Sequence, residues 1–440
     1  MEMLVRMLTA VAFFALGAGQ GSAQQHSIDL GQASQYFEEM KAVSGRDSGH
    51  LWGQPLYGPM LFVDPNTQFA VANQRDGEGK LSPQGNVFIG SVPPDMGVAN
   101  TSLNWAGVTW TLITWPLPEH RRDRVRLMTH ECFHRIEPRL GIQPPGDVLN
   151  SQLETRDGRT WLQLEFRALE RAVWASGLER RRAIADALYF RAYRRSLFPG
   201  SGPRENALEM NEGLAEYTGV TLASQSSGEA MSLAEATLQS AQERSSFLRT
   251  FAYVTGPAYG YLLDRSGQPW RSKLQASSDL SQVLAAAYQV DASPVTQSEA
   301  VRRAQAYDGD EIITLENDRE AGRQKLIADA KARLIDGPLL ILPLSPDVQY
   351  TFDPNTLLAI DDNNTLYPTA QVTDEWGTLR VENGALLVRD KGRLVRAQVP
   401  APADANSPQG DGWKLDLKLG WKLEKGARPG DRILVKATGG

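Results

Sequence analysis

Two histidines and one glutamate within five residues, His130, Glu131 and His134 in the order His-Glu-x-x-His, carry the clearest chemical signal in the chain. On an α-helix, side chains four positions apart lie on one face, so both imidazoles can bind one metal ion. Zinc takes nitrogen and oxygen ligands at about 2 Å, and a catalytic zinc keeps one position for water. A carboxylate beside the first ligand can take a proton from that water. We therefore predict one Zn²⁺ per chain, with His130 and His134 as ligands and Glu131 as the general base.

The residues around the motif predict the elements that hold it. Residues 119–136 contain neither Gly nor Pro and carry apolar side chains at helical spacing, so we expect one helix there. Pro138 and Gly141 should end that helix. Residues 108–115 are β-branched and aromatic, which is typical of a strand. The expected local arrangement is therefore a strand followed by the metal-binding helix.

A catalytic zinc needs a third protein ligand. Three of the five histidines remain after the pair is used, and none lies in a comparable helical setting: His26, His50 and His120. Residues 205–219 predict a helix that carries acidic side chains along one face. These acids are Glu209, Glu212 and Glu216. We therefore expect the third ligand to be a carboxylate from this helix.

Residues 211–217, Asn-Glu-Gly-Leu-Ala-Glu-Tyr, resemble the second zinc helix of the gluzincin metallopeptidases. The aminopeptidase-N-like branch of that family has an Asn-Glu-Gly-Phe-Ala pattern, in which the Glu is the third ligand. The resemblance implies that Glu212 binds the metal. It also implies that Glu216, one turn later, accepts the outer N–H of a zinc histidine, as an acid does in thermolysin-like members.

A second resemblance lies further along the chain. Residues 253–256, Tyr-Val-Thr-Gly, are similar to the Tyr-x-x-Gly stretch that follows the zinc Glu in aminopeptidase-N-like enzymes. There the Tyr hydroxyl stabilises the oxyanion of the tetrahedral intermediate, a type of contact that contributes a few kcal/mol. The resemblance implies this role for Tyr253. Tyr259 and Tyr261 are the alternatives, and packing of Tyr253 within a helix is equally open.

The chain also departs from that family. The connection from His134 to Glu212 is much longer than in those enzymes, and residues 162–172 and 182–193 within it predict two helices that would wall the cleft or form a lid. The Gly-x-Met-Glu-Asn motif that reads a free amino terminus is absent. We therefore expect peptide hydrolysis without aminopeptidase specificity. The strand at residues 108–115 would either pair with substrate, as an edge strand does in gluzincins, or lie in the core.

The amino terminus has the pattern of a secretory signal peptide. One basic residue precedes an apolar run at residues 7–19, and small residues occupy 21–23. We expect cleavage after residue 23 and an exported protein, periplasmic or extracellular in a bacterium. The mature chain has no apolar segment long enough for a membrane span. The single cysteine, Cys132, excludes an internal disulfide, and we expect it to pack in the core.

Charge limits the class of partner. The formal net charge of -6 argues against nucleic acid, so a peptide or protein substrate is the expected partner. The oligomeric state is open. Six arginines gather in one predicted helix: Arg180, Arg181, Arg182, Arg191, Arg194 and Arg195. We expect them to form a solvated face.

The composition predicts an α+β protein. We expect a signal peptide at 1–23, a strand-rich part of the catalytic unit at 24–118, a mainly helical zincin-like part at 119–336 and an all-β domain at 337–440. Within the second of these, two strands should flank an Asp-Pro-Asn turn at residues 64–66.

Motif, resemblance and signal peptide together favour an exported zinc metallopeptidase. The alternative is a catalytically inactive binding or scaffold protein of the periplasm, built on a peptidase fold. The two differ in whether pure protein hydrolyses peptides.

Overall fold

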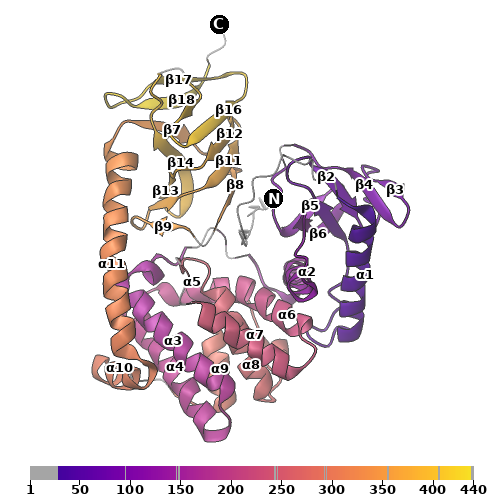
Figure 1. Ribbon diagram of the computed structural model, residues 1–440, viewed down its shortest axis with the longest axis vertical. Helices are drawn as coiled ribbons and strands as arrows, with labels where there is room; N and C mark the ends of the chain where they lie inside the picture. The colour runs from indigo at the N-terminus through magenta and orange to yellow at the C-terminus, as the bar shows by residue number, and fades with distance from the viewer. Residues whose placement is uncertain are drawn as a thin grey trace.

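The computed structural model describes residues 28–437 except 95, 145, 147–148, 242–243, 245, 292, 294, 354–355 and 405–406. The expected signal peptide, residues 1–23, lies outside these residues. Within them the chain is a mixture of helices and three sheets with a β-rich C-terminal region, so the predicted α+β class is confirmed at that level. Figure 1 shows the N-terminal sheet and the C-terminal strands on opposite sides above a helical base.

The N-terminal part combines one helix with a six-stranded sheet. Helix α1 (Leu30–Asp47) packs its apolar side chains on that sheet, where Phe37 stacks on Phe62. The strands are β1 (Met60–Val63), β2 (Phe69–Ala72), β3 (Ser82–Gln84), β4 (Val87–Ser91), β5 (Thr101–Trp105) and β6 (Val108–Thr114). Their order is β3-β4-β2-β1-β6-β5; β1 and β6 are parallel and the other neighbours antiparallel.

Two strand predictions have clear outcomes. The expected hairpin around the Asp-Pro-Asn turn is present: β1 and β2 pair, and Asn66 donates its backbone N–H to Asp64 Oδ1 at 2.8 Å. The strand expected at 108–115 is β6, but it lies between β1 and β5, and Trp110 is fully buried. The core-strand alternative is therefore correct for β6. The edge of the sheet nearest to it is β5.

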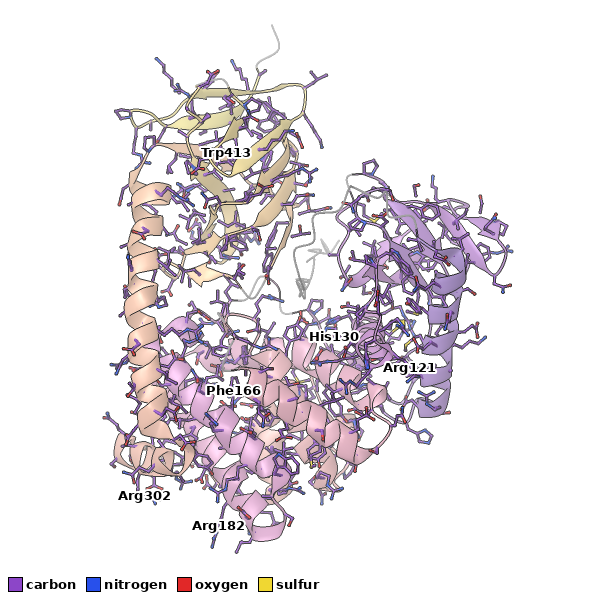
Figure 2. The ribbon with its side chains drawn as sticks, viewed as in Figure 1. Arg121, His130, Phe166, Arg182, Arg302 and Trp413 are labelled. Carbon is purple, nitrogen blue, oxygen red and sulfur yellow. The ribbon has the colours of Figure 1, made fainter. Side chains whose placement is uncertain are left out.

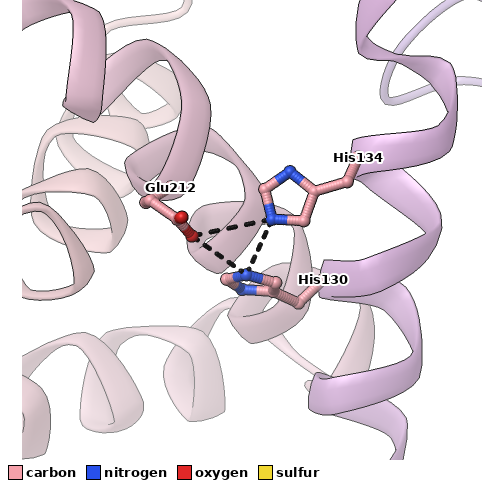
Figure 3. Close-up of side chains that lie close together, drawn as sticks. All are labelled: His130, His134 and Glu212. Atoms are coloured by element: carbon pink, nitrogen blue, oxygen red, sulfur yellow. Dashed lines mark hydrogen bonds and ion pairs between the residues drawn. The ribbon is translucent and has the colours of Figure 1, made fainter. Parts of the chain in front are cut away.

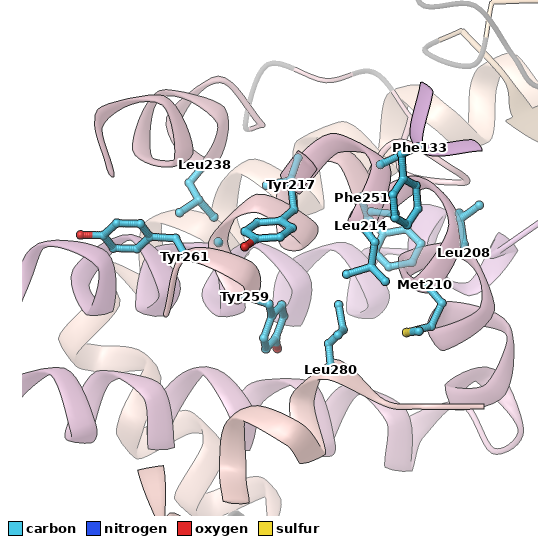
Figure 4. Packing of buried hydrophobic residues seen from close by; sticks show 14 of the residues in the cluster. Phe133, Leu208, Met210, Leu214, Tyr217, Leu238, Phe251, Tyr259, Tyr261 and Leu280 are labelled. Carbon is cyan, nitrogen blue, oxygen red and sulfur yellow. The ribbon is translucent and has the colours of Figure 1, made fainter. Parts of the chain in front are cut away.

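The middle of the chain is helical, as expected for 119–336. Its helices are α2 (Arg121–Ile136), α3 (Arg156–Trp174), α4 (Gly177–Leu197), α5 (Ser201–Leu208), α6 (Leu214–Ala223), α7 (Ser227–Ser240), α8 (Ala252–Arg265), α9 (Leu280–Tyr288), α10 (Gln297–Ala304) and α11 (Gly309–Lys331). Shorter turns are η1 (Glu137–Leu140), η2 (Ser151–Glu154), η3 (Glu209–Gly213), η5 (Arg271–Lys273), η6 (Gln305–Tyr307) and η7 (Ala332–Asp336). Figure 4 shows the apolar side chains between α2, α6 and α8, among them Phe133, Leu214 and Phe251.

The C-terminal region folds into two sheets around its own core. Its strands are β7 (Leu339–Pro343), β8 (Gln349–Phe352), β9 (Leu358–Ala359), β10 (Asn364–Tyr367), β11 (Ala370–Asp374), β12 (Gly377–Val381), β13 (Ala385–Asp390), β14 (Arg393–Pro400), β15 (Gln409–Gly410), β16 (Trp413–Leu417), β17 (Trp421–Lys425) and β18 (Arg432–Lys436). The sheet orders are β17-β18-β7-β14-β13-β10-β9 and β15-β16-β12-β11-β8. Side chains such as Trp376 and Trp413 fill the space between them.

Apart from the long helix α11 that leads to it (Figure 1), the β-rich region contacts the turn η2, the loop before α8 and the loop before β5. Leu248, from the loop before α8, is fully buried in the core of the β-rich region. Gln349 of β8 accepts a hydrogen bond from the backbone N–H of Gly97 at 3.2 Å. Among the helices described, none has both the length and the apolar character that crossing a membrane requires.

Candidate metal centre

Helix α2 carries the His-Glu-x-x-His motif and is anchored on both flanks. Its apolar residues Val125, Met128 and Phe133 are buried in the core between the N-terminal sheet and α6. His130 and His134 lie one turn apart on the other face, and each is only 6% exposed. Figure 2 places His130 where α2 meets the helices that follow it in the chain. Cys132 is buried and free, as expected of a packing residue.

The helix predicted at 205–219 is present, and all of these residues are helical. It contains the π-helical turn η3 between α5 and α6. The wider π turn separates acids that a regular helix would align. Glu209 points to Arg191 and Thr255, with 2.6 Å between its Oε1 and Thr255 Oγ1. Glu212 and Glu216 instead face α2, and the expectation of one acidic face was wrong for Glu209.

His130, His134 and Glu212 come together (Figure 3). His130 Nε2 lies 3.1 Å from His134 Nε2, and Glu212 Oε2 lies 3.5 Å and 3.6 Å from these two nitrogens. A tetrahedral metal with ligand distances of about 2 Å separates its ligand atoms by about 3.3 Å. The three ligand atoms therefore have the spacing that such an ion requires, and Glu212 is fully buried.

The outer nitrogens of both histidines face carboxylates. His130 Nδ1 lies 2.8 Å from Glu216 Oε2, and His134 Nδ1 lies 3.0 Å from Glu137 Oε2. Because a carboxylate only accepts, each imidazole donates through Nδ1 and leaves Nε2 for the centre. Arg126 pairs with Glu216, and Asn211 donates to Glu137. Both orientations match those of metal-ligating histidines.

Charge in the centre follows from these contacts. Burial alone would lower the pKa of His130, but the carboxylates of Glu212 and Glu216 outweigh it and raise the pKa to about 9. Burial would raise the pKa of Glu216, yet the Arg126 guanidinium and His130 hold it at about 2. The pKa of Glu212 is likewise held well below its usual range, against burial, by both histidines and Arg249. The carboxylates are thus ionised and available to a cation.

Glu131 differs from the other acids of the centre. It is 5% exposed, and its Oε2 is buried with no hydrogen-bond partner among the described residues. Burial raises the pKa of its carboxyl. A buried polar atom without a partner is costly, and such atoms are concentrated at functional sites. Glu131 therefore has a carboxylate oxygen free to bind a proton or a small polar ligand.

Tyr253 and Arg249 hold Glu212 from the side of α8. The Tyr253 hydroxyl donates to Glu212 Oε2 at 2.6 Å, and its ring stacks on His130 with centroids 5.6 Å apart. Arg249 donates to Glu212 Oε1 at 3.3 Å. Tyr259, one of the alternatives to Tyr253, instead donates to Glu165 at 2.9 Å. Of the three tyrosines, Tyr253 is the one that contacts the centre.

The other two described histidines are not among the residues that form the centre. His50 is exposed, His120 stands at the start of α2, and His26 lies outside the described residues. Sequence reasoning missed four residues of the centre: Arg126, Glu137, Asn211 and Arg249. Helical spacing from the motif could have found Arg126 and Glu137, because they lie four residues before His130 and three after His134. Arg249 comes from a distant loop and has no local signal.

The arginines of α4 are also not a solvated face. Arg181 and Arg182 are exposed, with Arg182 at the outer end of the helical part (Figure 2). Arg191 and Arg194 are buried in ion pairs with acids of α3 and α5–η3, namely Glu165, Glu205 and Glu209. The prediction failed because it used charge density alone, whereas the partners lie on other helices.

The centre thus consists of two imidazoles and one carboxylate, with a free buried carboxylate beside them. This ligand set suits zinc, and other first-row metals can bind it as well. No protein-family model, no curated protein and no solved structure matches this chain.

Proposed function

We propose that this protein is an exported zinc-dependent peptidase of the gluzincin type. The observation that supports this most directly is the buried group of His130, His134 and Glu212 with tetrahedral ligand spacing, next to the unpartnered carboxylate oxygen of Glu131. The ligand set alone does not select hydrolysis. The free base does, because hydrolysis needs a group that removes a proton from water beside the metal.

Each residue has a role in the proposed reaction. Zinc at this position supplies a Lewis acid that polarises a carbonyl and lowers the pKa of water. Glu131 takes the proton from the attacking water and then gives it to the leaving amine. Tyr253 keeps its proton, since burial and the Glu212 carboxylate raise its pKa. Its single O–H donates to Glu212 Oε2, so it would have to turn away from Glu212 to donate to a developing oxyanion. Glu216 holds the imidazole of His130.

Substrate would lie along the sheet. β5 is the edge strand beside β6, and it also contacts α2. An edge strand has free backbone N–H and C=O groups to which an extended peptide can hydrogen-bond. This supports a peptide as substrate. The signal-peptide pattern at 1–23 supports an exported, periplasmic or extracellular site of action.

The metal and the chemistry are tested together. Elemental analysis of the purified chain from Gln24 onward should give about one zinc per chain. Glu212→Ala should lose the zinc, and Glu131→Gln should keep it while losing hydrolysis of a mixed peptide library. Equal turnover by Glu131→Gln would refute the role of the base. Zinc binding without hydrolysis by the unchanged protein would favour an inactive binding or scaffold protein.

A further inference from the structure

Each histidine of the centre has its own carboxylate behind it. Glu216, behind His130, belongs to the stretch that resembles the gluzincin zinc helix. Glu137, behind His134, follows the last residue of α2 and opens the turn η1, directly before Pro138. It lies outside the His-Glu-x-x-His motif, three residues after His134. The question is what this second carboxylate adds.

Glu137 is fixed from two sides. Its side chain is 2% exposed, and its Oε2 lies 3.0 Å from His134 Nδ1. Asn211 Nδ2 donates to both carboxylate oxygens, at 2.9 Å and 3.0 Å. Because Asn211 directly precedes Glu212, one amide connects the acid behind His134 to the turn that carries the carboxylate ligand.

The two acids differ in how their charge is balanced. Arg126 pairs with Glu216, so that carboxylate has a cation beside it. No Lys or Arg in the described chain pairs with Glu137, whose contacts are His134 and the neutral amide of Asn211. A buried carboxylate paired only with an imidazole, which is charged only when protonated, has no permanent cation beside it, and this is unfavourable. A divalent metal bound through His134 would offset that charge.

We propose that Glu137 is a positioning residue that strengthens metal binding through His134, and that Asn211 holds Glu137 in place. This inference rests on the proposed metal centre. A carboxylate that accepts the outer N–H of a ligand histidine fixes the ring and makes its other nitrogen a stronger donor to the metal. The effect of Glu137 is therefore on affinity and on ligand geometry.

The test compares metal binding in four variants of the full mature chain. Zn²⁺ affinity is measured at one pH by competition with a chromophoric chelator, and the absorption spectrum is recorded with Co²⁺. Glu137→Ala removes both the hydrogen bond and the charge, and should weaken Zn²⁺ about 100-fold. Glu137→Gln keeps an oxygen that accepts the N–H of His134, and it should weaken Zn²⁺ binding about 10-fold. The Zn²⁺ affinity of Asn211→Ala should lie between that of the unchanged protein and that of Glu137→Ala.

Asp431→Asn is the matched control. Asp431 is 3% exposed, pairs with Arg428 at 2.8 Å and accepts the backbone N–H of Leu339 at 2.9 Å, all within the C-terminal β-rich region. Its variant should lower stability without changing Zn²⁺ affinity or the Co²⁺ spectrum. The spectrum of Glu137→Ala should shift, which loss of stability alone does not cause.

The outcomes separate this inference from the proposed function. In one outcome, the unchanged protein binds Zn²⁺ and hydrolyses peptides while Glu137→Ala and Glu137→Gln bind Zn²⁺ with unaltered affinity. That result would overturn the role of Glu137 and leave the proposed function standing. If the unchanged protein binds neither Zn²⁺ nor Co²⁺, the metal centre is overturned and Glu137 has no such role.

Discussion

The two oxygens of Glu212 have different surroundings. Oε2 faces both histidines and the Tyr253 hydroxyl, whereas Oε1 faces Arg249. The carboxylate is thus held in one orientation by groups from α2 and from the start of α8. The Tyr253 hydroxyl donates to Glu212 Oε2 and would have to leave this contact to donate to a reacting carbonyl.

Tyr253→Phe removes the hydroxyl and keeps the ring on His130. If that hydroxyl donates to the oxyanion, kcat should fall about 100- to 1000-fold, the usual loss for one such donor, while zinc content stays near one per chain. Steady-state kinetics with a fluorogenic peptide would measure it. Tyr261→Phe, a second buried tyrosine of α8, is the control and should hydrolyse normally. A similar loss in both variants would argue for a general effect on α8 packing.

Helices of the centre approach closely at glycines. A Cβ on Gly256 of α8 would lie 2.2 Å from the backbone oxygen of Gly213, the last residue of η3. A Cβ on Gly219 of α6 would lie 2.8 Å from the backbone oxygen of Arg126 in α2. These contacts set how near Glu212 and Glu216 come to the histidines. The distances between the proposed ligand atoms therefore depend on Gly256 and Gly219, which let the helices approach closely.

Gly256→Ala should force α8 and η3 apart. We expect a loss of about 1–3 kcal/mol in the free energy of unfolding, with reduced zinc content, because the backbone oxygen cannot move aside as a side chain can. Urea unfolding and metal analysis would measure both. Gly322→Ala is the control, because Gly322 is exposed in α11 with nothing within 4 Å of its added Cβ. That variant should be as stable as the unchanged protein or gain about 0.5–1 kcal/mol.

Helices α3 and α4 carry ion pairs that stabilise the turn η3, from which Glu212 comes. Arg191 of α4 donates to Glu165 at 3.0 Å and to Glu209 of η3 at 2.9 Å. Arg194 donates to Glu205 of α5 at 2.9 Å. The long connection between His134 and Glu212 therefore carries the charges that hold η3 in place.

This network should make stability depend on pH. Burial would raise the pKa of Glu205, but the guanidinium groups of Arg194, Arg195 and Arg191 outweigh it and hold the pKa at about 2. Since the folded pKa lies below the unfolded value, Glu205 stabilises the fold above about pH 4.5 and loses this contribution as the pH falls toward 2. The loss is about 3 kcal/mol.

Urea unfolding at pH 7, 5, 4 and 3 would measure this dependence. Glu205→Gln should be less stable at pH 7, and its stability should fall less steeply between pH 5 and 3. Parallel profiles for the two proteins would contradict the assignment to Glu205.

At the scale of the whole molecule, the β-rich region and the metal centre share one loop. Leu248 is buried in the β-rich core, and its backbone oxygen accepts from Asn150 N at 3.2 Å. The next residue, Arg249, donates to Glu212. The packing of the C-terminal region is thus connected to Glu212, the proposed metal ligand, through two consecutive residues.

Leu248→Ala should therefore affect both stability and metal binding. Core truncation of this type costs about 2–5 kcal/mol, and the displaced Arg249 should also change Zn²⁺ affinity. Leu342→Ala, in β7 and equally buried in the same core, is the control. It should lower the free energy of unfolding by a similar amount and leave Zn²⁺ affinity unaltered. Equal Zn²⁺ affinity in both variants would show that packing of the β-rich region does not affect the proposed metal centre.

The local features of this protein could be predicted from short stretches of sequence. The spacing of His130 and His134, the helix that carries them and the hairpin at 64–66 follow from periodicity and turn chemistry, which are properties of a few neighbouring residues. The change from helices to short strands near residue 337 was also visible. The assignments of Glu212 and Tyr253 came from resemblance to a family, and the fold places both beside the histidines.

Which acids pair with which cations became clear only in the folded protein. A regular helix would have aligned Glu209 with Glu212, but the π turn orients Glu209 toward Arg191, with which it forms an ion pair. Arg191 belongs to α4, whose arginines we expected to be solvated. Glu137 and Arg249 gained their places only when α2, η3 and the loop before α8 came together. Ion pairs between distant segments depend on how the helices pack against one another, and this packing produces no periodic pattern in the sequence.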